Sequence, residues 1–201
     1  MKKIIIIIMI ISCSNINGQK SKKEEGIIFG LKGGLNISNF IGDIKDNTGN
    51  IKDNTIRTSV HLGVFSEIMI NDGFSIQPEI LYSGQGYSGS NDPGFSRSKY
   101  DYINIPILAK IYVAERISVE AGPQIGFLVS AKERTDNDNI TLKNQKIVDF
   151  GLNIGFAYDL KNGVFFQTRY NLGLSNINSG PDANARKYTN SVIQLSVGVK
   201  L

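Results

Sequence analysis

The segment 100–113, YDYINIPILAKIYV, carries an apolar side chain at every second position. This period of two is typical of a β-strand, because successive side chains point to opposite faces of a sheet. The row between the isoleucines is mixed and contains Lys110. The pattern leaves open which row faces the interior. Isoleucines are buried in a soluble sheet, whereas they face lipid in a membrane barrel.

The same alternation recurs along the chain and predicts eight strands. They lie near 26–40, 57–70, 74–87, 100–113, 117–130, 147–160, 164–177 and 191–201. Three short connections, 71–73, 114–116 and 161–163, alternate with four long polar ones, 41–56, 88–99, 131–146 and 178–190. Short turns at one end and long loops at the other are typical of outer-membrane barrels. We therefore expect an all-β protein, an eight-stranded antiparallel up-and-down transmembrane β-barrel with short periplasmic turns and four long extracellular loops.

The short connections also predict the pairing register. If each is a three-residue loop, residue 70 faces 74, 113 faces 117 and 160 faces 164, with glycine in the left-handed conformation in NDG and KNG. Apolar residues then meet apolar ones and polar residues meet polar ones, as a correct register requires. The predicted pairs are Ile111–Val119, Ile105–Ile125, Tyr158–Phe166, Lys110–Glu120, Glu67–Gln77 and Asn153–Asn171.

Three prolines fall inside predicted strands, and proline cannot donate a hydrogen bond to a neighbouring strand. They are Pro78, Pro106 and Pro123. A closed barrel has no free edge to accommodate them. We therefore expect bulges or local breaks in the pairing there, and strands that are poorly defined at these positions.

The two alternating rows of side chains on each predicted strand differ in composition, and this difference indicates which row faces lipid and which faces the lumen. One row of each strand is almost purely apolar, whereas the other combines glycines with charges of both signs. The interior of an eight-stranded barrel is just wide enough for side chains to fill it. We predict an inward-facing polar network of Lys32, His61, Glu67, Glu79, Lys110, Glu120, Asp149, Arg169 and Lys200. Within it, Lys110 is expected to lie between Glu79 and Glu120. The alternative is a soluble or periplasmic lipocalin-like barrel that binds a small apolar ligand.

The first 18 residues have the layout of a secretory signal: two lysines, an apolar run over 4–11, then small and polar residues. Eight apolar residues are too few to span a bilayer, which takes about 20 in a helix. Cleavage after Gly18 would leave 19–201 as the barrel domain. Lipidation at Cys13 is the alternative. Removal of residues 1–18 takes away two of the 22 basic residues and leaves 20 against 18 acidic ones. Because these charges nearly balance, we expect no nucleic-acid partner.

Motifs for chemistry are few. His61 is the only histidine, and the sequence places no serine and carboxylate beside it. The segment TDNDN at 135–139 lacks the glycine and distal glutamate of an EF-hand. GLKGG and GQG lack the lysine and the strand-to-helix context of a phosphate loop. We expect no catalytic residue, cofactor or metal site, and no enzymatic activity. An outer-membrane lipid-modifying enzyme that uses His61 stays as an alternative.

Six stretches in order resemble the PorT-like outer-membrane β-barrel family. They are FGLKGGLNISNF, SIQPEILYSGQGY, YINIPILAKIYV, AGPQIGFLVSAK, FGLNIGFAYDL and RYNLGLSNI. The resemblance implies an eight-stranded barrel in the outer membrane of a Gram-negative cell, with outer-membrane lipid and the barrel assembly machinery as partners. It also implies an accessory role in protein secretion for some members. The chain ends in Leu201, where such barrels often carry an aromatic residue.

These observations favour a non-enzymatic outer-membrane barrel that is structural or interacts through its long loops. Binding residues are often on loops held by a rigid scaffold. The loop sequences do not identify the loop-binding partner. A small pore is the remaining alternative, and a lumen filled with side chains argues against it.

Overall fold

The computed structural model describes residues 26–42, 56–88, 96–135, 139–141, 146–176 and 188–201. The strands are β1 (Ile27–Gly42), β2 (Arg57–Asn71), β3 (Phe74–Ser88), β4 (Ser96–Ala114), β5 (Ile117–Thr135), β6 (Asn139–Thr141), β7 (Val148–Asp159), β8 (Val164–Gly173) and β9 (Tyr188–Lys200). The described residues form no helix, and therefore none that could cross a membrane.

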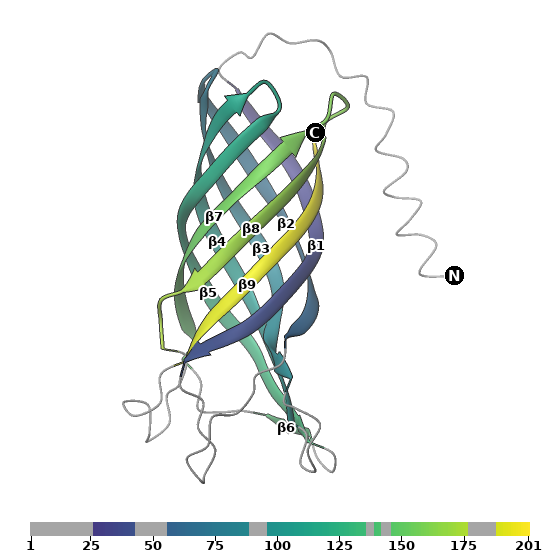
Figure 1. Cartoon of the computed structure of the whole chain (residues 1–201), viewed down its shortest axis with the longest axis vertical. Coiled ribbons are helices and arrows are strands. Elements are labelled where there is room, and N and C mark those ends of the chain that lie inside the picture. Colours follow the sequence, from purple (N-terminus) through teal and green to yellow (C-terminus); the bar gives the residue numbers. More distant parts are fainter. Residues whose placement is uncertain (1–25, 43–55, 89–95, 136–138, 142–145, 177–187) are drawn as a thin grey trace, which may run out of the picture.

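Eight of these strands close into an antiparallel barrel (Figure 1). Each strand pairs with its neighbour in the chain, and β1 pairs with β9 to complete the ring. The eight-stranded antiparallel barrel predicted from the sequence is therefore confirmed. We call the end that carries the β2–β3, β4–β5 and β7–β8 connections the short-turn end. The chain also ends there, and the opposite end is the long-loop end (Figure 1).

Several strand bounds differ from the prediction. β4 begins at Ser96 and β5 extends to Thr135, so parts of the expected loops 88–99 and 131–146 are paired strands. The three-residue strand β6 pairs with the end of β5 and extends this hairpin beyond the barrel. β8 is shorter than expected and ends at Gly173. The remainder of the long loops, and the expected signal segment 1–18, lie outside the described residues.

The predicted register holds through the body of the barrel. The paired residues include Ile111 with Val119, Ile105 with Ile125, Lys110 with Glu120, Tyr158 with Phe166 and Asn153 with Asn171. Glu67 and Gln77 lie between the pairs Phe65–Glu79 and Ile68–Ile76, which have the same register. One face of each hairpin is therefore consistently apolar and the other polar, as the sequence pattern required.

Two of the three turns are tighter than predicted. Asn71 pairs with Phe74 and Ala114 with Ile117, so these turns have two residues and not three. No described residue has positive φ in either turn, and a bulge in the adjoining strand shifts the register. Such bulges adjust strand twist beside a turn that lacks left-handed residues. The third turn matches the prediction: Leu160 N–H donates to the Val164 carbonyl at 2.7 Å, and Gly163 has φ +81°.

The prolines break the pairing locally without bulges. Pairing lapses beside Pro78 in β2–β3, beside Pro106 in β3–β4 and beside Pro123 in β4–β5, and it resumes in the same register. The expected ladder breaks are therefore confirmed. The alternative, a bulge at each proline, does not occur at these positions. The expectation of poorly defined strands is wrong, because β3, β4 and β5 are each continuous. Proline lacks a backbone N–H donor, and the hydrogen bonds on either side of it keep each strand paired.

The outer surface of the barrel is apolar and the lumen is polar. Large aliphatic and aromatic side chains are exposed on all eight strands of the ring, with Leu62 on β2 at 66 %. Most of the buried side chains are polar or charged. This arrangement is the reverse of a soluble protein, where exposed apolar surface of this extent is rare. It matches a barrel whose outer face contacts lipid.

Candidate functional site

The polar lumen is the candidate site, and it divides into two parts along the barrel axis. On every strand of the ring, one charged residue of the lumen lies toward the short-turn end, and apart from Asp149 the lumen residues of the other half are uncharged amide, hydroxyl and imidazole side chains. We call the first part the charged half: Lys32, Glu67, Glu79, Lys110, Glu120, Asp159, Arg169 and Lys200. We call the second part the amide half: Asn36, Ser38, His61, Ser83, Gln85, Tyr102, Asn104, Gln124, Asp149, Asn153, Asn171, Asn190 and Gln194.

The centre of the charged half is a four-residue ion network around Arg169. The Arg169 guanidinium donates two hydrogen bonds to Glu79, at 2.9 and 2.8 Å, and a third from Nε to Glu120 at 2.8 Å. Lys32 Nζ lies 2.8 Å from Glu79 and also donates to Gln167 at 2.8 Å. Gln167 donates to Glu120 at 2.7 Å. Two cations therefore neutralise two carboxylates, and each buried group has hydrogen-bond partners, as a buried ion network requires.

This network crosses the lumen. Glu79 is on β3, whereas its partners Arg169 and Lys32 are on β8 and β1. Side chains from opposite walls therefore meet at this level and occupy the interior. An arrangement of this kind stabilises the barrel and leaves no room for a wide aqueous channel there.

A second ion network lies nearer the short-turn end. Glu67 accepts from Ser75 at 2.8 Å and from the Tyr112 hydroxyl, and Lys110 and Lys200 lie 3.4 and 2.9 Å from its carboxylate. Lys200 also reaches Asp159 at 2.8 Å, and Lys110 donates to Gln77 at 3.2 Å. Again two cations meet two carboxylates.

The predicted position of Lys110 between Glu79 and Glu120 is therefore wrong. Lys110 contacts Glu67 on β2, while Glu79 and Glu120 are bound by Arg169. Adjacent-strand reasoning placed the three side chains on neighbouring strands but could not include β8. Closure of the ring brings β8 across the lumen, and the planar guanidinium of Arg169 matches two carboxylates better than a lysine ammonium does.

Aromatic rings also occupy the charged half. Phe65 and Phe165 are buried in the lumen with ring centroids 5.4 Å apart in an edge-to-face arrangement. A Cβ added at Gly30 would lie 2.2 Å from the Phe65 ring, and one at Gly198 would lie 2.4 Å from the Phe165 ring. These glycines therefore make room for the rings. The period-two pattern gives both phenylalanines inward positions, so the signal was present in the sequence, as it was for Asp159.

The amide half is held by hydrogen bonds centred on His61. Asn36 Nδ2 donates to the Gly84 carbonyl at 2.7 Å, which makes Asn36 Oδ1 the acceptor. His61 Nδ1 lies 2.8 Å from that oxygen and must carry the proton, so His61 Nε2 accepts from the Ser196 hydroxyl at 2.8 Å. Gly34 lies between His61 and Ser196 in the sheet, and its missing side chain leaves space for this contact.

Sequence reasoning missed this serine, because Ser196 is 135 residues from His61 and on a strand that is not adjacent. A serine hydroxyl, a neutral imidazole and an orienting amide are the components of nucleophilic catalysis. However, Ser196 is only 7 % exposed, and His61 and Asn36 are fully enclosed. The hydroxyl faces the interior of a filled barrel.

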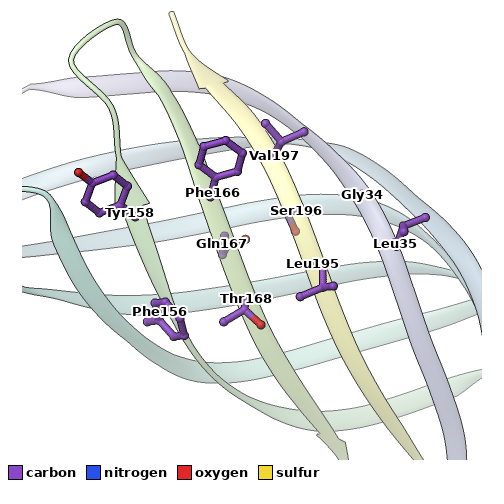
Figure 2. A pocket seen from close by; sticks show the side chains of 10 residues that line it. All are labelled: Gly34, Leu35, Phe156, Tyr158, Phe166, Gln167, Thr168, Leu195, Ser196 and Val197. Carbon is purple, nitrogen blue, oxygen red and sulfur yellow. The ribbon is translucent and has the colours of Figure 1, made fainter.

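The opposite side of this part of the wall forms a shallow apolar groove of about 480 Å³ (Figure 2). Phe156, Tyr158, Phe166 and Leu195 line the groove together with the smaller Thr168. Figure 2 shows the aromatic side chains on the near side and Ser196 and Gln167 behind the strands. The strand backbone thus separates the lipid-facing groove from the His61–Ser196 pair.

All nine side chains predicted to face the lumen lie there. Eight are buried, and Lys200 is partly exposed at the short-turn end. Seven of them belong to the two ion networks, and His61 lies in the amide half. Asp149 lies near the long-loop end, where no cation among the described side chains pairs with it. Within the described ranges, no group of three or more His, Cys, Asp or Glu side chains could hold a metal ion.

Comparison with known proteins gives one family and several similar folds. The family model for the outer membrane protein beta-barrel domain matches residues 17–179. No curated protein matches the chain in sequence.

Two solved structures are similar in fold. Neisserial surface protein A (NspA) has a TM-score of 0.58 at 14 % identity and covers 88 % of this chain and 100 % of its own. Ail, the attachment invasion locus protein of Yersinia pestis, has a TM-score of 0.53 at 11 % identity, covering 89 % and 100 %. At these identities the likeness concerns the fold alone.

Proposed function

Because the chain belongs to the outer membrane protein β-barrel domain family, we propose that it is a non-enzymatic outer-membrane barrel that interacts through its four extracellular loops. The observation that carries the proposal is the crossing of the lumen by the Arg169–Glu79–Glu120 network. Because side chains cross the lumen at this level, the barrel interior is not suited to transport. In this orientation the short-turn end is periplasmic and the long-loop end faces outward, where loops have access to partners.

Two measurements test this proposal. The first is membrane fractionation with gel mobility before and after boiling, and we expect a membrane protein with a heat-modifiable band. The second is ion conductance after reconstitution into liposomes, and we expect none above that of empty liposomes. A soluble protein without a mobility shift would support the lipocalin-like alternative. A wild-type protein that conducts would support the pore.

Two finer features belong to the proposal. Residues 1–18 would direct export, and the intact mass of the mature protein separates a chain that begins at Gln19 from one lipidated at Cys13. An accessory role in protein secretion rests on the resemblance to the PorT-like family. Deletion of the gene should then change the set of secreted proteins, whereas a purely structural barrel should leave that set unchanged.

A second candidate is supported by the contacts of Ser196 and His61. An acyl-transferring enzyme would use Ser196 as nucleophile and His61 as base. A fluorophosphonate probe tests this: the Ser196 oxygen attacks phosphorus, fluoride leaves and the proton passes to His61 Nε2. Under the non-enzymatic proposal the folded barrel shows no labelling, because Ser196 is enclosed. Labelling that disappears in Ser196→Ala and His61→Gln, but not in the outward-facing Ser66→Ala, would favour the enzyme.

A further inference from the structure

Asp149 differs from the other lumen carboxylates because no described lysine or arginine side chain forms an ion pair with it. Glu67, Glu79, Glu120 and Asp159 each lie within 3.4 Å of a lysine or arginine nitrogen. Asp149 is 8 % exposed, and its Oδ2 accepts from the Asn190 side chain at 2.6 Å. No described group donates to Oδ1. A buried carboxylate without a compensating charge is costly, and such groups in proteins are usually paired or coordinate a cation.

Further polar atoms lie around Gly126, the residue that faces Asp149 across the strand pair. Gly126 on β5 pairs with Asp149 on β7. A Cβ at Gly126 would lie 2.7 Å from Asn104 Oδ1, 3.5 Å from the Tyr102 ring and 3.6 Å from the Asp149 carbonyl oxygen. Tyr102 is 1 % exposed, and its hydroxyl lies close to the side chains of Asn190 and Asp149. Without a side chain, Gly126 leaves a narrow space that is bordered by two oxygen atoms and by the edge of the Tyr102 ring.

We propose that this space is a cation site, in which Asp149, Tyr102 and Asn104 supply oxygen ligands to a small hard cation. Carboxylate, carbonyl and hydroxyl oxygens are the ligands that such ions prefer. The site has a single negative charge, and affinity for these ions rises with the number of charged ligands. Binding is therefore weak, and Na⁺ and Ca²⁺ are the two candidate ions.

The position of the site fits an ion taken from outside. Asp149 is the second residue of β7 and Asn190 the third residue of β9, so both lie at the long-loop end. The ion networks of the charged half lie between this site and the short-turn end. An ion would therefore enter from the side of the long loops, and it would order the strand ends from which those loops leave.

Terbium luminescence tests the proposal on the folded barrel in a detergent without carboxylates. The chain has eight tyrosines and no tryptophan, so tyrosine excitation reports Tb³⁺ held close to a tyrosine ring. We expect saturable emission that CaCl₂ or NaCl displaces and choline chloride at equal ionic strength does not. Asp149→Asn keeps the shape of the side chain and should weaken Tb³⁺ binding by about tenfold or more. Tyr102→Phe removes the hydroxyl ligand and should weaken binding as well.

Two further variants control for unrelated effects. Gly126→Ala removes no charge but fills the space, and it should also reduce Tb³⁺ binding. Glu115→Gln removes an exposed carboxylate in the β4–β5 turn and should change nothing. Heat-modifiable gel mobility verifies that each variant is folded. Displacement by NaCl alone would identify a sodium site, and displacement by micromolar to millimolar CaCl₂ a calcium site.

The proposal is overturned if Asp149→Asn binds Tb³⁺ as the wild type does. It is also overturned if neither CaCl₂ nor NaCl displaces the ion beyond the effect of choline chloride, because the emission would then come from adventitious Tb³⁺ on the surface. None of these outcomes depends on whether the loops bind a partner.

Discussion

The charged half and the amide half of the lumen solve the same problem in different ways. Each must fill the interior of a narrow barrel with polar side chains that have partners. The charged half uses four cations and four carboxylates in two neutral networks that join opposite walls. The amide half uses side chains that are donors and acceptors at once, such as the chain from Gln194 through Asn36 to Ser83.

The difference teaches where the barrel is most sensitive to substitution. Loss of one member of a buried ion pair leaves a buried charge, whereas loss of a neutral amide leaves only an unpaired dipole. The charged half should therefore dominate stability, and the amide half should tolerate change. The long-loop end, where the loops leave the barrel, is thus the end that can vary without loss of the fold.

Arg169→Ala should have the largest effect, because it leaves Glu79 and Glu120 without their main cation. We expect a loss of about 3–5 kcal/mol in the free energy of unfolding. Urea unfolding in detergent measures it, with the exposed turn variant Lys161→Ala as control. A loss no greater than that of Lys161→Ala would contradict the ranking of the two halves.

Lys110→Ala should destabilise the barrel less than Arg169→Ala but more than any single substitution in the long loops. Lys200 stays beside Glu67 in this variant and keeps part of the charge balance. We expect a loss of about 1–3 kcal/mol, seen as a lower temperature for loss of the folded gel band. If Lys110→Ala kept wild-type heat resistance, the proposed role of this lysine would be wrong.

Asn36→Ala tests the amide half at its most connected residue. It leaves His61 and Gln194 without their shared acceptor, and we expect a loss of about 1–2 kcal/mol in the free energy of unfolding. The same urea titration measures it. An effect as large as that of Arg169→Ala would show that neutral hydrogen bonds, and not ion networks, dominate the lumen.

Thr168→Ile should have the smallest effect and the opposite sign. Thr168 lies in the groove on the outer face, and a larger apolar side chain there adds lipid-facing apolar surface without contact with the lumen. We expect an increase of about 0.5–1 kcal/mol in the free energy of unfolding in lipid. Destabilisation would indicate that the groove is occupied or that this face is not in lipid.

Much of the fold could be predicted, because the alternation within the strands, the lengths of the loops and the register of the hairpins all pointed to the same barrel. The turn lengths were the weak point: Asn71 and Ala114 pair one residue closer to the turn than expected. A bulge is decided by local backbone twist, and the side-chain pattern changes little with it. The prolines disturb the strands less than expected, since the neighbouring residue pairs hold each strand in register across the break.

The amino-acid sequence by itself determined which side chains face the lumen and which face outward, because a strand alternates its faces whatever surrounds it. It also determined the neighbours within each hairpin, such as Lys110 opposite Glu120. Only closure of the ring decided that Arg169 meets Glu79, that His61 meets Ser196 and that Asn190 meets Asp149. These contacts join strands that are not adjacent, so they depend on the curvature and diameter of the barrel and on how far each side chain reaches across it.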